Sequence, residues 1–262
     1  MHRFFVPPAM LAAPTALVEG ALARQIAVVL RLRPGEEVVL LDGLGNEAWC
    51  ELGEVAPRRV TVRQTSRRRN QAETSVAVHL FPALIRAPRL ELVLQKATEL
   101  GVASVTPFLS RRCVARLAPD GVPDRWRAIV REASEQSGRG RLPELQPPVS
   151  LETACRVASS ADLAFCCSEC GGDDLRMLTA TPGLRSVSVL VGPEGGLEPE
   201  EVAAAAEYGI RPISLGQRIL RAETAAIAVC AAIYCLLGEW ASGRAEVTAH
   251  LPVLERVVSH AS

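Results

Sequence analysis

From residue 76 onward, short apolar runs alternate with longer segments of helical periodicity, and this alternation constrains the fold more than any other feature. Residues 76–81, 102–108, 162–167, 187–191 and 212–215 have the length and composition of buried strands. Residues 88–100, 124–136 and 199–209 have the apolar spacing of helices, and a helix rich in small residues is expected to reach about residue 237. Such alternation predicts an α/β domain with a mostly parallel sheet covered by helices on both faces.

The first 70 residues have a different rhythm. Short β-rich runs at 3–6, 38–41, 48–52 and 60–65 are separated by glycine turns, with one helix near 19–30. This pattern predicts a small barrel-like domain. We place the domains at residues 1–72 and 73–241, and find no functional signal in the tail, 242–262.

Composition excludes several classes of protein. No apolar run approaches the roughly 20 residues of a membrane span, and the first residues lack the regions of a secretory signal. A soluble, cytoplasmic protein is expected. The 8 cysteines are scattered, which favours reduced thiols. One C-x-x-C, Cys167 to Cys170, has no second pair or histidine at usable spacing, so no metal is predicted.

The formal net charge is zero, but the charge is unevenly distributed. Residues 1–145 hold 21 Lys+Arg and 15 Asp+Glu, whereas residues 146–262 hold 8 and 14. Six arginines at positions 58, 59, 63, 67, 68 and 69 lie in a stretch without an acidic residue, as a phosphate-contacting surface requires. Lys96 is the only lysine, so a general bias toward arginine remains an alternative explanation.

Three segments have the residue types of a functional site. Residues 187–196 (VSVLVGPEGG) run from a buried strand into a glycine-rich loop, a place where α/β sheets bind ligands. Neither G-x-G-x-x-G nor the P-loop pattern is present, and a simple tight turn is the alternative.

The second segment, residues 214–226 (SLGQRILRAETAA), leaves a strand through a glycine and enters the small-residue helix. Helix capping, with Arg221 paired to Glu223, is its alternative explanation. The third, residues 131–141 (REASEQSGRGR), is either an ordinary helix end or a presentation of Arg139 and Arg141 to phosphate.

Taken together, these segments resemble in order and spacing the RsmE-type 16S ribosomal RNA uridine-N3 methyltransferases of the SPOUT superfamily. The resemblance continues through MHRFF at 1–5, LDG at 41–43, LQKATELGV at 94–102, PF at 107–108 and RRC at 111–113, and covers residues 1 to about 238. It implies a PUA-like RNA-binding β-barrel followed by a SPOUT-type parallel sheet with a C-terminal trefoil knot. It also implies S-adenosyl-L-methionine as cofactor, a uridine of 16S ribosomal RNA or the small ribosomal subunit as substrate, and a homodimer.

The resemblance also implies functional residues. The cofactor would contact loops that include Cys167, Leu190, Gly192, Pro193, Glu194, Gly195, Gly196, Leu215, Gly216, Ile219, Leu220, Arg221, Thr224 and Ala225. Arg221 would stabilise the anion that uracil forms when N3 loses its proton. Glu223 and Glu132 are candidates for the base, and bulk solvent is the alternative proton acceptor. RNA would contact Arg3, Arg67, Arg68, Arg69, Arg86, Arg139 and Arg141.

One segment departs from the family pattern. A basic-Gly-acidic-basic run is common there before the helix, but this chain has Arg86-Ala87-Pro88-Arg89. Two other functions stay open: a SPOUT enzyme that acts on transfer RNA or a ribose hydroxyl, and a non-catalytic RNA-binding or assembly protein with the same fold. For the dimer, the helix from 224 to 237 and the helix with Leu94 and Leu100 are the expected contact elements.

Overall fold

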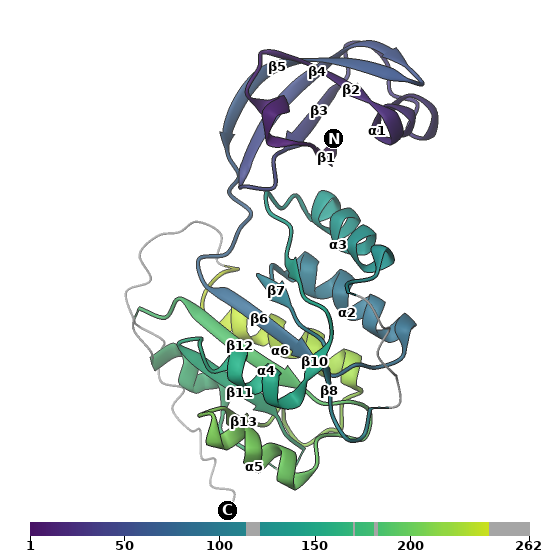
Figure 1. The fold of residues 1–262 in the computed structure, drawn as a ribbon. Coiled ribbons are helices and arrows are strands. Elements are labelled where there is room, and N and C mark those ends of the chain that lie inside the picture. Colours follow the sequence, from purple (N-terminus) through teal and green to yellow (C-terminus); the bar gives the residue numbers. More distant parts are fainter. Residues whose placement is uncertain (114–120, 170, 181–182, 241–262) are drawn as a thin grey trace, which may run out of the picture.

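The computed structural model describes residues 1–113, 121–169, 171–180 and 183–240. Figure 1 shows two parts: a β-barrel-like unit at the N-terminus, and a larger α/β unit below it. The chain passes from one to the other through a connector around residue 70.

A five-stranded sheet forms the N-terminal unit, in the order β1-β3-β4-β5-β2. The strands are β1 (His2–Phe5), β2 (Thr15–Glu19), β3 (Glu37–Leu41), β4 (Asn46–Ala56) and β5 (Arg59–Arg69). A 3-10 turn (Pro8–Leu11) and helix α1 (Gly20–Arg24), which continues as a π-helical turn (Gln25–Val29), complete it. Leu40, Leu52 and Ile26 lie in its core, so alternating apolar residues form the sheet as predicted. Strand β2 was not predicted, and β5 is longer than predicted because its arginine-rich end stays paired with β4.

The second unit contains a six-stranded sheet in the order β13-β11-β12-β6-β7-β9, and all its strand pairs are parallel. The strands are β6 (Ala77–Pro82), β7 (Ser104–Val105), β9 (Glu144–Leu145), β11 (Leu163–Cys167), β12 (Ser186–Val191) and β13 (Arg211–Ile213). A further pair, β8 (Phe108–Leu109) with β10 (Val149–Ser150), is joined to the end of β6 by a single bridge between Ala83 and Phe108. The expected strand at 102–108 is therefore two short strands, separated at Pro107, which has no N–H to donate to a ladder.

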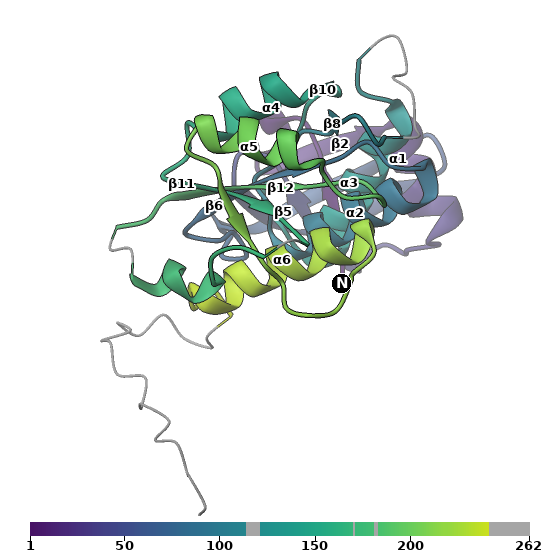
Figure 2. The ribbon, with the colours of Figure 1, turned by 90° about the horizontal axis from the view of Figure 1, so that it is seen from below.

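Helices cover both faces of this sheet, which confirms the predicted α/β class. They are α2 (Ala87–Leu100), α3 (Asp124–Ser137), α4 (Leu151–Ala158), α5 (Pro199–Glu207) and α6 (Ala222–Leu236), with a 3-10 helix at Leu175–Ala180. Figure 2 shows α4 and α5 on one side of the sheet and α6 on the other. Helices α2 and α3 share a core with α6, and α4, which was not predicted, shares one with α5.

The helices expected at a dimer interface are already in contact within one chain. Helix α2 packs on α6, and the Leu94 side chain is 0% exposed in the core between them. Leu94 is therefore not available to a second copy of the chain. The trefoil knot implied by the resemblance stays a prediction.

Hydrogen bonds join the two units at α3 and the loop that follows it. Phe5 N donates to Glu135 Oε1 at 3.0 Å, and Arg131 Nη1 donates to the Phe5 carbonyl at 3.3 Å. Asn70 Nδ2 in the connector donates to the Gly138 carbonyl at 2.9 Å. The barrel is therefore held against the end of α3 that carries the EASEQSGRGR motif.

Candidate active site

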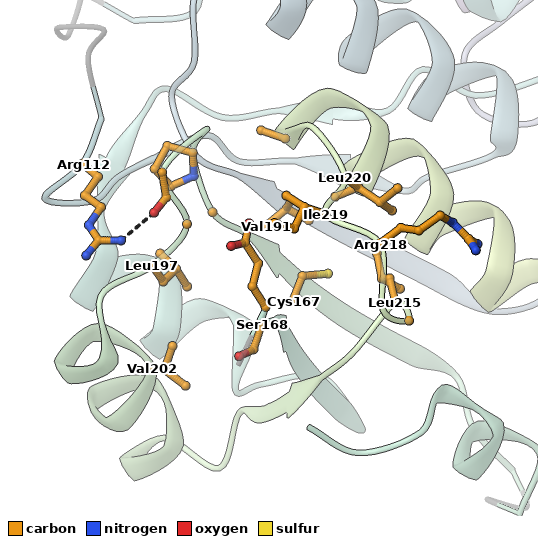
Figure 3. Close-up of a pocket in the computed structure, with 18 of the residues that line it drawn as sticks. Arg112, Cys167, Ser168, Val191, Leu197, Val202, Leu215, Arg218, Ile219 and Leu220 are labelled. Atoms are coloured by element: carbon orange, nitrogen blue, oxygen red, sulfur yellow. Dashed lines mark hydrogen bonds between the residues drawn. The ribbon is translucent and has the colours of Figure 1, made fainter. Parts of the chain in front are cut away.

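A cavity of about 490 Å³ opens where β11, β12 and β13 end. These three strands are parallel neighbours, so their carboxyl ends, and the loops that leave them, lie at one edge of the sheet. Figure 3 shows the side chains around this space. Its lining consists of Arg112, Cys167, Ser168, Glu169, Val191, Gly192, Pro193, Gly195, Gly196, Leu197, Pro199, Val202, Leu215, Gly216, Gln217, Arg218, Ile219, Leu220, Ala222 and Ala225.

Both predicted glycine-bearing loops line this one cavity. Residues 192–196 follow β12, and residues 215–220 follow β13. Gly192 has little room for a side chain, because a Cβ there would lie 3.0 Å from the Leu197 nitrogen and 3.2 Å from the Gly196 carbonyl carbon. Gly216 has φ +101, which L side chains rarely adopt. The backbone can therefore approach a ligand closely in both loops.

The walls of the cavity are mostly apolar and neutral. Val191, Leu215 and Leu220 contribute aliphatic surface. Burial strongly raises the pKa of Cys167, so its thiol stays protonated and acts as a small apolar group. Such walls suit an aromatic ring held by main-chain atoms.

Charged side chains stand at the edges of the cavity. Figure 3 places Arg112 and Arg218 on opposite sides. Arg112 Nη1 donates to the Gly195 carbonyl at 2.6 Å and thus holds the first glycine loop. Arg112 belongs to the RRC motif but was not assigned to the site, because nothing in the sequence shows that the segment after β8 reaches this loop. Glu169, also unassigned, faces the same loop: its carboxylate lies about 4 Å from where a Cβ on Gly196 would stand.

Four of the expected cofactor residues do not line the cavity with their side chains. Leu190 points into the core and is 0% exposed, because successive strand residues face opposite sides. Glu194 turns away to Arg89. Arg221 and Thr224 are exposed at the start of α6. The other ten expected residues line it.

Arg89, in the first turn of α2, connects the two loop systems. Its Nη1 donates to Glu194 Oε1 at 2.8 Å, and its Nε lies 3.8 Å from Glu223 Oε1. Glu223 is only 8% exposed, and within the described residues its Oε2 has no hydrogen-bond partner. The capping explanation required Glu223 to pair with Arg221. The structure pairs it with Arg89 instead, and shows no side-chain cap at the start of α6.

Glu132, the second candidate base, lies elsewhere. It lines a separate groove between α2 and α3, together with Gln95 and Lys96, and is not part of the cavity lining. The structure therefore gives it no access to the loops of the first cavity.

The arginine-rich strand β5 is less positive than its sequence suggested. Arg59, Arg63 and Arg68 form ion pairs with Glu54, Glu51 and Glu47 of β4. The antiparallel register of β4 and β5 brings Glu47 and Glu51 directly opposite Arg68 and Arg63. Arg68 also stacks on Trp49, with its Cζ 4.8 Å from the ring centroid. Acidic residues are absent from the arginine run itself, but the neighbouring strand supplies them.

The remaining expected RNA contacts have varied surroundings. Arg67 Nη1 donates to the Leu11 carbonyl at 3.2 Å, while Arg69 and Arg141 are exposed. Arg86 is the exposed N-cap residue of α2. Arg3 is half-buried beside Gly138.

Arg139 does not fit the expected role in RNA binding. It is 4% exposed, and its Nη2 lies 2.8 Å from Glu73 Oε2. Its Nη1 donates to the carbonyls of Thr98 and Val102 at 3.2 and 2.8 Å. A guanidinium buried in this way joins the connector to the end of α2 and cannot reach a phosphate. Sequence reasoning could not separate it from Arg141, two residues away.

The described ranges show neither a metal site nor a membrane-spanning helix. Within them, no three His, Cys, Asp or Glu side chains gather as a metal site, and Cys170 of the C-x-x-C lies outside them. In the same part of the chain, no helix is both long enough and apolar enough to span a bilayer.

Comparison with known proteins identifies the family. Residues 72–234 match the family model of an RNA methyltransferase domain, and residues 26–64 match an RNA methyltransferase PUA domain. The ribosomal RNA small subunit methyltransferase E of Mycobacterium bovis is 34% identical over 233 residues, which cover 86% of this chain and 88% of that protein. The chain belongs to the ribosomal RNA small subunit methyltransferase E family. This finding confirms the resemblance on which the sequence prediction rested.

Two further methyltransferase E proteins are similar to this chain over most of their length. The Bacillus subtilis relative is 29% identical, with 89% of this chain and 96% of that protein covered. The crystal structure of the Neisseria gonorrhoeae enzyme, bound to S-adenosyl methionine, matches with a TM-score of 0.82 and 31% identity, covering 90% of this chain and 98% of that one. The fold is therefore that of the methyltransferase E family, with a PUA domain joined to a parallel-sheet domain.

Proposed function

We propose that this protein transfers the methyl group of S-adenosyl-L-methionine to N3 of a uridine in 16S ribosomal RNA. The observation that carries the proposal is that two glycine-bearing loops line one cavity, although they follow β12 and β13, which lie on either side of β11 in the parallel sheet. Membership of the methyltransferase E family supports the reaction and the RNA, and the N. gonorrhoeae relative with bound cofactor supports the site.

The residues of the cavity fit this cofactor. A volume of about 490 Å³ lies within the range of roughly 300 to 1,000 Å³ for small-molecule sites. Gly192, Gly195 and Gly216 leave main-chain atoms open to an adenine ring and a ribose, between aliphatic walls. Arg112 and Glu169 provide opposite charges for the carboxylate and the ammonium of the methionine part. When bound, the cofactor supplies an electrophilic methyl group.

The side chains of this protein have to prepare uracil as the nucleophile. N3 carries a weakly acidic proton, so the transition state needs a proton acceptor or a cation near O2 and O4. Arg221 is our candidate for the cation, because its exposed side chain stands where the second loop enters α6. Glu223 follows two residues later, and its unpartnered Oε2 makes it the candidate acceptor.

The proposed reaction also implies partners and location. We infer that the substrate is 16S ribosomal RNA or the small ribosomal subunit, and that the protein works in the cytoplasm as a homodimer. Helix α6 supports the dimer, because Thr224, Ala228 and Ala232 leave small residues on its partly exposed side. Light scattering with size exclusion tests this: a mass of twice 28.0 kDa is expected, and a single-chain mass contradicts it.

Two measurements test the function. Calorimetry should show S-adenosyl-L-methionine binding, and saturating cofactor at about 100 times Kd should stabilise the fold by about 2.7 kcal/mol. Transfer of labelled methyl to a 16S ribosomal RNA transcript, followed by nucleoside mass spectrometry, should give 3-methyluridine. A ribose-methylated product would favour a different SPOUT reaction, and no cofactor binding at millimolar concentration would leave only a non-catalytic RNA-binding role.

Replacing Arg221 separates catalysis from binding. We expect Arg221→Ala to lower kcat at least a hundredfold while the cofactor Kd changes less than about threefold, because the guanidinium acts only on charge that develops in the transition state. Arg156→Ala, which removes an exposed arginine on α4, is the control and should retain activity. An Arg221→Ala enzyme with normal turnover would remove the role assigned to this residue.

A further inference from the structure

The LDG motif, residues 41–43, begins a tight turn between β3 and β4. No residue of this turn has a role in the proposed methyl transfer. Asp42 Oδ1 accepts hydrogen bonds from the backbone nitrogens of Leu44 and Asn46 at 2.8 and 2.9 Å. Its Oδ2 accepts from Asn46 Nδ2 at 2.6 Å. These bonds fix the turn and hold Gly45 at φ +91, a conformation that favours glycine.

This turn lies at the junction between the two units. Gly45 N donates to the Gly140 carbonyl at 3.1 Å, and Asn70 N donates to the Gly45 carbonyl at 3.0 Å. Gly45 therefore contacts both the connector and the loop that follows α3. In Figure 1 this loop rises to the barrel beside the connector.

Two guanidinium groups meet over Gly45. From the point where a Cβ on Gly45 would stand, Arg141 Nε is 3.1 Å away, and Arg141 Nη2 and Arg69 Nη1 are each 3.7 Å away. The distance between Arg141 Nη2 and Arg69 Nη1 is therefore no more than twice 3.7 Å. Arg69 comes from the end of β5 and Arg141 from the loop after α3, so the two units contribute one cation each.

The surrounding carboxylates are already engaged. Glu47 binds Arg68 and Asn70, and Glu73 binds Arg139 and the backbone nitrogen of Arg141. Among the described residues, neither Arg69 nor Arg141 forms an ion pair, and both side chains are exposed. Two like charges held close together without a counter-ion form a site for an external anion.

We propose that Arg69 and Arg141 form a fork that binds one backbone phosphate of the RNA substrate. Guanidinium groups present several N–H donors in fixed planes, which match the oxygens of a phosphodiester. The fork rests on the proposed function for the identity of its ligand as RNA. Phosphate contacts fix the register of a nucleic acid without reading its sequence, so the fork would orient the RNA relative to the cofactor cavity.

The same geometry distinguishes these arginines from their neighbours. Arg68 is paired with the Glu47 carboxylate within the barrel. Arg67 Nη1 donates to the Leu11 carbonyl, and Arg69 Nη1 donates to the Leu44 carbonyl and to Asn46 Oδ1 at 3.4 and 3.3 Å, which are neutral acceptors and leave the charge of Arg69 uncompensated. Arg3 lies close by, with its Cζ 3.5 Å from the Cβ position of Gly138, and its buried Nε has no partner in the described part of the chain. Arg3 therefore adds positive charge to the junction, whereas the charge of Arg68 is compensated by Glu47 within the sheet.

Charge removal is the first test. Binding of a 16S ribosomal RNA transcript to the full chain is measured at several salt concentrations for Arg69→Gln, Arg141→Gln and the double variant. Each single change is expected to weaken binding roughly tenfold, and the double variant to lower the salt dependence of log K by about 0.7 to 0.9, the contribution of one phosphate. Because one phosphate serves both arginines, the double variant should lose less than the product of the single losses.

Arg156→Gln is the matched control, because it removes an exposed arginine from α4. It should change neither the affinity nor the salt dependence. Equal losses in Arg156→Gln and Arg141→Gln would show a general charge effect and overturn the fork. Losses that multiply in the double variant would assign the two arginines to separate phosphates, and would overturn the shared site.

A change without loss of charge is the second test. Gly45→Ala places a methyl group 3.1 Å from Arg141 Nε, so it should spread the fork and weaken RNA binding. Gly43→Ala is the control: it has a similar positive φ of +72 in the same turn, but its nearest contact is Phe5 Cδ1 at 4.0 Å. Thermal unfolding compares the backbone strain of the two variants. Equal RNA affinities for them would contradict the geometry proposed here.

Methyl transfer, measured on the same preparations, distinguishes a failure of the proposed function from a failure of the proposed fork. A wild-type protein that binds RNA but transfers no methyl group would end the proposed function and leave the fork intact. A wild-type protein that methylates the transcript, beside fork variants with unchanged affinity and salt dependence, would end the fork and leave the function intact.

Discussion

At the scale of single residues, Arg89 shows how one side chain links two parts of the site. It pairs with Glu194 of the first loop and lies 3.8 Å from the nearly buried Glu223 in the first turn of α6, just after the second loop. We expect Arg89→Met to lower the free energy of unfolding by about 1 kcal/mol, a small value because Arg89 is 40% exposed. Cofactor affinity should fall severalfold, as the first loop loses a tether. Chemical denaturation and calorimetry measure the two effects.

A second substitution isolates the contact with Glu223. In a Glu223→Gln background, Arg89→Met should lower the free energy of unfolding by less than in the wild type, because no buried carboxylate is left without a cation. Arg89→Lys keeps the charge and serves as the control. If Arg89→Met lowers the stability of both backgrounds equally, the contact between Arg89 and Glu223 does not contribute to the stability of the fold.

At the scale of elements, the end of α2 depends on a single glycine. Gly101 caps this helix at φ +109, and a Cβ there would lie 2.9 Å from Thr74 Cγ2 and 3.8 Å from the Tyr234 ring. We expect Gly101→Ala to lower the free energy of unfolding by about 3 kcal/mol, through both backbone strain and displaced neighbours. The denaturant midpoint at constant slope measures this loss.

Gly209 provides the comparison, after the end of α5. Its φ is +77, but nothing lies within 4 Å of its Cβ position. Gly209→Ala should therefore cost only about 1 kcal/mol, the strain of the backbone alone. Similar losses at the two positions would mean that the neighbours of Gly101 move aside freely.

At the scale of the whole molecule, the contact between the barrel and α3 should depend on pH. Burial raises the pKa of Glu135, although its carboxylate accepts the Phe5 N–H and lies near Arg131. The folded state therefore disfavours the ionised form, and stability falls as pH rises from the ordinary pKa of 4.5 through the raised folded value. We expect Glu135→Gln to raise the Tm by about 2 °C at pH 7 and to change it little at pH 4.

The control for this prediction is Glu207→Gln, which removes an exposed carboxylate on α5, far along the chain from the junction. It should leave the Tm nearly constant at both pH values. A Glu135→Gln variant that is less stable at pH 7 would show that the attraction of the nearby Arg131 charge outweighs the burial of the carboxylate.

The sequence by itself determined the parallel α/β class, the barrel before it and the two glycine-bearing loops. Those features follow from local properties: apolar period, helix stops and the freedom of glycine. It also predicted that both loops follow strands of one sheet, which parallel topology then brings to a common edge.

Only the tertiary structure decided which charges are free. The cross-strand register set Glu47 and Glu51 against arginines of β5, and the packing of α2 buried Arg139 while Arg141 stayed exposed. Arg89 and Arg112 lie roughly 80 to 135 residues away in the sequence from the residues that they contact at the site. No local sequence pattern could therefore predict these contacts. The spacing of residues along a chain determines how each strand and helix forms, whereas the pairing of a charge depends on which distant segment packs beside it.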